Sequence, residues 1–149
     1  MSGFAGERQL TDLLKEELSV WVQINELTDK QTALLEADDV EALTESMDRR
    51  HELIEKIKGL HQESNVLMQS YISATEKGGE KSKAVEAVIA QIREKITISA
   101  QCNEKNLAIA GTMKDGYSER AGELGQKRKG IGAYALDVPY NSELYDGKG

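Results

Sequence analysis

Few residues of this sequence have the types and spacing that chemistry requires. The two histidines, His51 and His61, lie ten residues apart, which places them about 80° apart around a helix rather than on one face. Neither histidine belongs to a Glu-x-x-His motif, so a di-metal site of the helical-bundle type is not expected. The segment 48–51, Asp-Arg-Arg-His, is typical of a solvated and partly paired helix surface.

The sequence also lacks the patterns of nucleophilic and nucleotide-binding sites. Cys102 is the single cysteine and has no histidine near it in sequence, which favours a buried and inert thiol. The glycine pairs Gly122/Gly125 and Gly130/Gly132 do not follow a strand pattern, as a dinucleotide-binding turn requires. We therefore expect no enzymatic activity, no cofactor and no bound metal.

Charge narrows the class of partner. The 149 residues carry 26 acidic and 19 basic side chains, and the acidic excess is concentrated in residues 1–46. An acidic chain disfavours binding to nucleic acid, because contacts with the phosphate backbone rely on Lys and Arg. With no secretory leader and no apolar run approaching the ~20 residues of a membrane helix, we expect a cytoplasmic protein that does not insert into membranes.

Long helices must position whatever function the chain has, since a single proline and sustained helical periodicity predict an all-α fold. A first helix is expected over about residues 7–37 and a second over about residues 40–75, with Asp38-Asp39 breaking the first and capping the second. The short connection makes the two helices an antiparallel hairpin. In the first helix, one row of apolar residues recurs every seven positions, at Leu13, Val20, Leu27 and Leu34. Leu10 and Ile24 flank this row on one side, and Leu14, Trp21 and Leu35 flank it on the other.

A third helix, expected over about residues 83–122 and packed along the hairpin, follows a break that contains Gly78-Gly79 and ends at Ser82, a possible cap. Its inner face is apolar as far as Ile96 and then becomes small and polar. Asparagines on that face need hydrogen-bond partners, which either the hairpin or a bound protein supplies. The residues that continue the face are Ser99, Asn103, Asn106, Ala110, Met113 and Tyr117.

These elements predict one helical-bundle domain over residues 1–125, followed by a flexible C-terminal tail over residues 126–149. The tail carries three of the five tyrosines. Tyrosines of such a segment either anchor a partner or fold back on the hairpin, and both interpretations are open.

The chain resembles the FlgN family of bacterial flagellar export chaperones. The resemblance rests on the opening hairpin from Ala33 to Leu43 that leads into Arg49-Arg50, and on the segment Cys102-Asn103-Glu104-Lys105-Asn106. It also rests on the ending Leu144-Tyr145-Asp146-Gly147-Lys148-Gly149. In many relatives a glycine follows the second asparagine, where this chain has Leu107.

The resemblance implies a non-enzymatic cytoplasmic chaperone. Such a protein binds hook–filament junction proteins, prevents their premature assembly and delivers them to the export gate and ATPase complex. Contact with the export gate is implied for Tyr145, with Tyr140 second. Client binding is implied for the C-terminal part of the chain, at Asn103, Asn106, Leu107, Ala110, Met113, Tyr117 and Leu124.

Two other interpretations are open on the sequence alone. One is a chaperone of the filament-cap type, which shares the helical hairpin; the other is a coiled-coil adaptor or dimerising protein that has no client. A tight dimer with a fully ordered third helix would favour the adaptor. The sequence patterns assign neither an oligomeric state nor a particular client.

Overall fold

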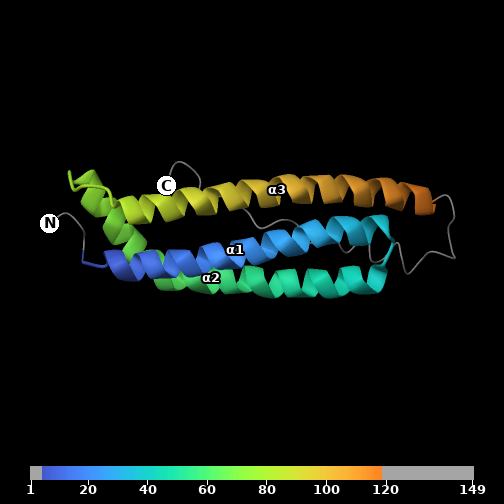
Figure 1. Ribbon diagram of the computed structural model, residues 1–149, viewed down its shortest axis with the longest axis horizontal. Coiled ribbons are helices and arrows are strands. Elements are labelled where there is room, and N and C mark those ends of the chain that lie inside the picture. Colours follow the sequence, from blue (N-terminus) through green and yellow to red (C-terminus); the bar gives the residue numbers. More distant parts are fainter. Residues whose placement is uncertain (1–4, 119–149) are drawn as a thin grey trace.

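The protein is an elongated three-helix body. The computed structural model describes residues 5–118, with side chains as far as residue 115, and contains α1 (Glu7–Glu36), α2 (Val40–Glu76) and α3 (Lys83–Ser118). α1 and α2 form an antiparallel hairpin, and α3 runs parallel to α1 on its other side, so that α1 contacts both neighbours (Figure 1). The expected all-α fold, with a long hairpin and a third helix along it, is confirmed for these residues.

Some of the sequence predictions fall outside the described residues. These are the positions of Leu124, Tyr140 and Tyr145, the proposed tail 126–149 and the side chain of Tyr117.

The turn between α1 and α2 is determined by local backbone and side-chain bonds. Asp38 adopts a left-handed backbone conformation with φ 59°, and the N–H groups of Asp38 and Asp39 donate back to the last turn of α1, to the carbonyls of Leu35 and Leu34. The carboxylate of Asp39 then accepts the N–H of Ala42 at 3.1 Å. This side-chain cap of α2, predicted from the sequence, is confirmed.

The break between α2 and α3 depends on two glycines. Gly78 has φ +93°, a conformation that other residues rarely adopt, and a Cβ on Gly79 would lie 2.7 Å from the carbonyl oxygen of Ala74. Ser82 then begins α3, because its hydroxyl accepts the N–H of Val85 at 3.2 Å. Both glycines are thus needed to end α2 where α3 can turn back along α1.

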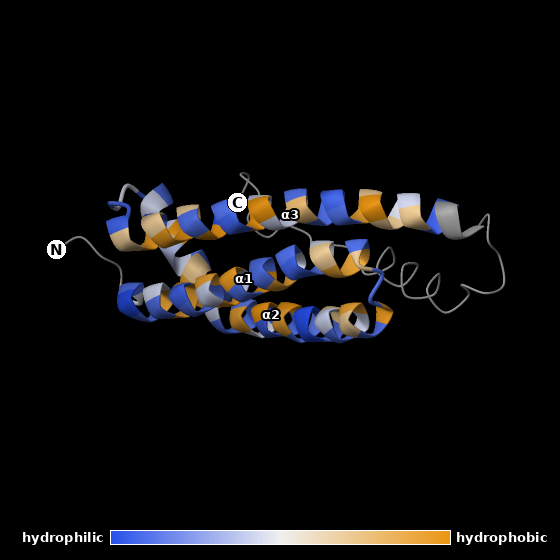
Figure 2. Cartoon of the chain, turned by 45° about the vertical axis from the view of Figure 1, so that its right-hand side comes forward, coloured by the Kyte–Doolittle hydropathy of each residue, from blue (hydrophilic) through white to orange (hydrophobic). Residues whose placement is uncertain are grey.

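The apolar core consists of two clusters of unequal size. In Figure 2 the hydrophobic residues recur along the helix sides that face neighbouring helices. The distal cluster, near the hairpin turn, contains buried Leu35, Leu43 and Ala110, with Leu34, Met47, Leu107, Ile109 and Met113 packed against it. The proximal cluster, at the other end, is larger: Leu10, Leu14, Val20, Trp21, Ile24, Leu53, Ile54, Ile57, Leu60, Tyr71, Val85, Val88, Ile89, Ile92 and Ile96.

A buried carboxylate lies within the proximal end of the hairpin. Glu17 is 1% exposed; one of its oxygens accepts the indole N–H of Trp21 at 3.2 Å and lies 3.0 Å from Nε2 of His61. A buried carboxylate requires such partners, because desolvation without them is costly. The contact with His61 ties α1 to α2 at this level.

The phenol of Tyr71 joins the end of α2 to the start of α3. Its hydroxyl donates to the carboxylate of Glu86 at 2.6 Å and accepts the N–H of Ser82 at 3.1 Å. Burial and the bond to Glu86 raise the pKa of Tyr71 to about 12. The neutral phenol is therefore the form that the fold stabilises.

We predict that Tyr71→Phe lowers the free energy of unfolding by about 1–2 kcal/mol, because Glu86 and Ser82 both lose a partner. The pKa in the fold is higher than the value of about 10 for an unfolded chain. The stabilisation is therefore complete below about pH 10 and is lost as the pH rises towards 12.

Urea unfolding of Tyr71→Phe and of the native chain, at neutral and at alkaline pH, measures this effect. The phenolate absorbance of the native chain should include one late-titrating tyrosine that the Tyr71→Phe variant lacks. Equal stability of Tyr71→Phe and the native chain at neutral pH would contradict the prediction.

Candidate functional site

A layer of buried polar side chains separates the two apolar clusters. Each of the three helices contributes to this polar layer at the same level of the bundle, where apolar residues would otherwise continue the core. Its members are Thr28 and Gln31 of α1, Ser46 and Arg50 of α2, and Ser99, Asn103 and Asn106 of α3.

Arg50 joins α2 to α1 within this layer. The side chain is 1% exposed, and its Nε donates to the hydroxyl of Thr28 at 3.2 Å. The same hydroxyl donates to the carbonyl of Ile24 at 2.8 Å, so it acts as acceptor and donor at once. A guanidinium keeps its charge even when buried, and its polar surroundings are therefore a condition of the fold.

Asn106 joins α3 to α1. Its Nδ2 donates to the carbonyl of Thr28 at 2.9 Å, and its Oδ1 accepts the hydroxyl of Thr32. The hairpin therefore supplies the hydrogen-bond partners of Asn106. Asn103, one turn earlier in α3, is also buried, at 2% exposure.

The polar layer is not fully satisfied. Gln31 donates through Nε2 to the hydroxyl of Ser46 at 3.2 Å, but its buried Oε1 has no hydrogen-bond partner within the described part of the chain. A buried acceptor without a partner costs roughly 1–3 kcal/mol. The layer therefore holds the helices together less strongly than an apolar layer of the same size.

The residues implied as client-binding lie on one side of the second half of α3, residues 99–115, which we call distal α3. This side faces the end of the hairpin. Asn103, Asn106 and Ala110 are buried. Leu107 and Met113 are partly buried and pack against the distal cluster. The structure thus brings these five residues together on the inner face of α3, next to the polar layer.

One interpretation of the sequence is wrong. Segment 48–51 is not a solvated surface throughout, because Arg50 is buried, whereas Arg49 is exposed and pairs with Glu52 at 3.1 Å. Arg50 lies in the row that contains Leu43, seven residues before it, and Ile57, seven residues after it. This heptad position indicates that Arg50 is buried, but a pattern defined by apolar residues alone does not include an arginine.

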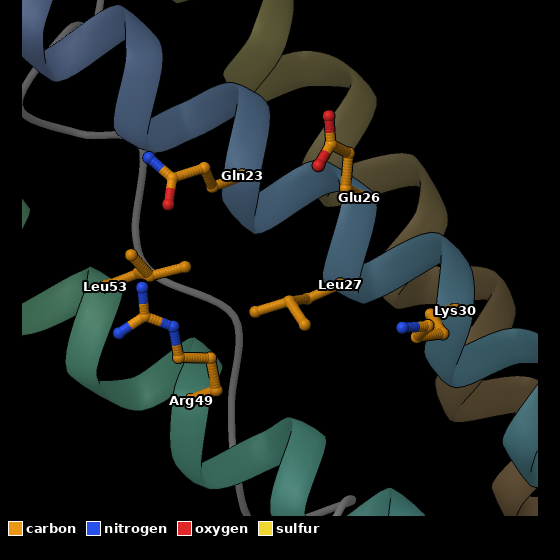
Figure 3. Close-up of a pocket in the computed structure, with 6 residues that line it drawn as sticks. All are labelled: Gln23, Glu26, Leu27, Lys30, Arg49 and Leu53. Atoms are coloured by element: carbon orange, nitrogen blue, oxygen red, sulfur yellow. The ribbon is translucent and has the colours of Figure 1, made fainter.

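Two shallow surface grooves flank α1. One, of about 390 Å³, lies between α1 and α2; Leu27 and Leu53 extend into it from opposite helices, with Arg49 beside Leu53 (Figure 3). The other, of about 230 Å³, lies between α1 and α3 and is lined in part by Val22 and Ile98, two of the exposed large hydrophobic residues.

The described residues contain neither a three-residue cluster of metal ligands nor a membrane-spanning helix. In that part of the chain, no group of three or more His, Cys, Asp and Glu side chains is arranged to hold a metal ion. None of its three helices has a stretch apolar and long enough to span a membrane.

Cys102 lies at the α1–α3 contact and is half-buried. Its Sγ is 3.8 Å from a carboxylate oxygen of Asp29 and 3.9 Å from the hydroxyl of Thr32. Burial raises the pKa of the Cys102 thiol, and the charge of Asp29 adds to the increase. The thiol is thus held in its protonated and less reactive form.

Comparison with known protein families identifies a match that covers most of the chain. The family model described as FlgN protein matches residues 1–115, a range that contains both apolar clusters and the whole polar layer. Neither a curated protein nor a solved structure matches the chain.

We predict that Asn106→Ala lowers the free energy of unfolding by about 1–3 kcal/mol, because it removes both bonds that Asn106 makes to α1. Asn65, which is exposed on α2, provides the matched control, and Asn65→Ala should change stability by less than about 0.5 kcal/mol. Urea unfolding followed by circular dichroism measures both variants. Identical midpoints for the two would show that the bonds of Asn106 contribute nothing to the fold.

Proposed function

The chain belongs to the FlgN family of flagellar export chaperones, and we propose that it binds hook–filament junction proteins in the cytoplasm and delivers them to the export gate and ATPase complex. The family match over residues 1–115 is the observation that carries this proposal. The chaperone acts by binding alone and catalyses no reaction.

The proposed client site is the inner face of distal α3. Asn103, Asn106, Leu107, Ala110 and Met113 offer hydrogen-bonding groups flanked by apolar side chains on one helix face. An amphipathic helix of the client is the complementary partner for such a surface. Tyr117 and Leu124 continue the site by sequence position.

Binding at this face requires distal α3 to exchange partners. Asn106 and Ala110 are buried against the hairpin, so a client reaches them only when that contact opens. The polar layer supports such an exchange, since buried hydrogen-bonded groups can be transferred to water more easily than apolar groups can.

The proposed contact with the export gate involves the C-terminal end of the sequence. We assign this contact to Tyr145 in the first place and to Tyr140 in the second. A tyrosine contributes a large contact area at a low cost in side-chain entropy, which suits recognition by a short segment.

We predict that the double substitution Leu107→Asp and Met113→Asp weakens binding of a junction protein about a hundredfold or more, because two apolar contacts become charged. The melting temperature should change by only a few degrees, since neither residue belongs to the proximal cluster. Ala108→Asp with Thr112→Asp, on the exposed face of the same helix, is the matched control and should bind normally.

Titration calorimetry with a purified junction protein of the same bacterium measures these affinities. If the inner-face variant unfolds rather than only losing binding, Leu107 and Met113 are core residues and the client site lies elsewhere. Binding of the filament-cap protein in place of any junction protein would instead identify a cap-type chaperone.

We predict that Tyr145→Ala leaves client affinity unchanged and weakens binding to the cytoplasmic domain of the export gate about tenfold or more, as expected when one anchoring tyrosine is removed. A pull-down of that domain with the loaded chaperone provides the measurement. Tyr134→Ala is the comparison within the same segment. Undiminished capture of the gate domain by the Tyr145→Ala variant would remove this residue from the proposed contact.

A further inference from the structure

Distal α3 is attached to the hairpin differently from the first half of the helix. The first half buries five aliphatic residues in the proximal cluster: Val85, Val88, Ile89, Ile92 and Ile96. In distal α3 the buried residues are Ser99, Asn103, Asn106 and Ala110, and only the last of these is apolar. The two halves of α3 can therefore be released separately, because breaking the distal contacts leaves the proximal cluster intact.

The surface that receives distal α3 is the apolar end of the hairpin, which α3 contacts mainly through α1. We call it the hairpin seat and define it by Leu34, Leu35, Leu43 and Met47. Ala110 is buried against this cluster, with Leu107 and Met113 packed beside it. The seat thus covers the apolar residues that the proposed function assigns to the client.

Distal α3 needs such a cover. A helix of this length is marginally stable in water by itself, and exposed apolar side chains on it would promote association. Beyond the hairpin turn α3 continues past the ends of α1 and α2 (Figure 1). No part of α1 or α2 can cover α3 beyond that point. The seat and the polar layer are therefore the contacts that hold distal α3 against the hairpin.

We propose that the hairpin seat is an internal competitor of the client, so that one face of distal α3 is bound in turn by the seat and by an amphipathic helix of the client. This inference rests on the client site proposed above. The occupant that the seat holds in the free protein is distal α3 itself, through Leu107, Ala110 and Met113. The apparent affinity for the client is then the intrinsic affinity multiplied by the fraction of molecules in which distal α3 has left the seat.

This competition has a consequence that distinguishes it from ordinary core packing. A substitution that weakens the seat without touching α3 should increase the affinity for the client, although it removes buried apolar contacts. Leu43 is the suitable position, because it is a buried α2 residue of the distal cluster. Leu60 is the matched control, a buried leucine of the same helix in the proximal cluster.

Calorimetric titration of the full-length chain with a purified junction protein tests the competition. Leu43→Ala should bind about tenfold more tightly than the native chain, because truncating a buried leucine shifts the opening equilibrium at least that far. Leu60→Ala should bind with native affinity. Met47→Ala, a milder change at a partly buried position of the seat, should bind more tightly by a smaller factor and keeps the test valid should Leu43→Ala fail to fold.

Cys102 provides a measure of opening that needs no client. The thiol is half-buried between α3 and α1, and burial raises its pKa, so release of distal α3 should accelerate its reaction with a thiol reagent. Labelling should be about tenfold faster in Leu43→Ala than in Leu60→Ala. Since the chain has one cysteine, the full-length protein reports on this position alone.

The outcomes separate the two proposals. Faster labelling together with tighter binding supports competition by the seat. Faster labelling with unchanged or weaker binding overturns the competition and leaves the client site in place, and unchanged labelling shows that the seat does not hold distal α3. Absence of any junction-protein binding by the native chain, with labelling faster in Leu43→Ala, overturns the proposed function instead.

Discussion

Arg50 of α2 is buried against α1, and a guanidinium carries a fixed positive charge. Its position requires polar groups around it, and Thr28 supplies a direct hydrogen bond from α1. The helices must therefore place their polar residues at one level of the bundle. Leucine-rich helices alone tolerate displacement by one heptad, whereas buried polar partners in fixed positions select one register.

Polar contacts fix the position of α1 relative to both of its neighbours. Glu17 lies opposite His61 and Thr28 lies opposite Arg50, so equal steps along α1 and α2 in opposite directions join partners. On the other side, the carbonyl of Thr28 accepts Asn106. One threonine thus contacts both neighbouring helices, through its hydroxyl and its carbonyl, and the level of all three is set at that residue.

Much of the fold followed from local sequence signals. The cap at Asp39 and the glycines at 78 and 79 act within one turn of the backbone, and such short-range effects are visible in a sequence. In the apolar stripe of α1, the predicted flanking residues Leu10, Ile24, Leu14, Trp21 and Leu35 are all buried, whereas most of the central row is not. Leu13, Leu27 and Leu34 lie partly exposed between two buried rows, which also contain polar residues. Those rows are Leu10, Glu17, Ile24 and Gln31, and Leu14, Trp21, Thr28 and Leu35.

The polar layer shows why the site was predicted only in part. Asn103 and Asn106 were recognised because they continue the apolar phase of α3, whereas Gln31 and Arg50 were missed because apolar residues alone defined the stripes of α1 and α2. Extending each row by seven residues regardless of residue type would have placed both in the interior. What no pattern supplies is the partner: an amide on an inner face pairs equally well within the chain or with a bound protein, and only the packing of three helices decides between them.

The polar layer helps to meet two opposing requirements of a protein that binds apolar helices. A face that binds an amphipathic helix has to be covered when empty, since exposed apolar surface leads to association, yet a cover with a fully apolar interface would be too stable to displace. The distal cluster is small, with three buried residues, and beside it one oxygen of Gln31 has no hydrogen-bond partner among residues 5–118. A cover of this composition excludes water from Leu107 and Met113 while contributing far less than the proximal cluster does. On the proposed function, the stability of the hairpin and the availability of the client site are therefore set by different residues of the same three helices.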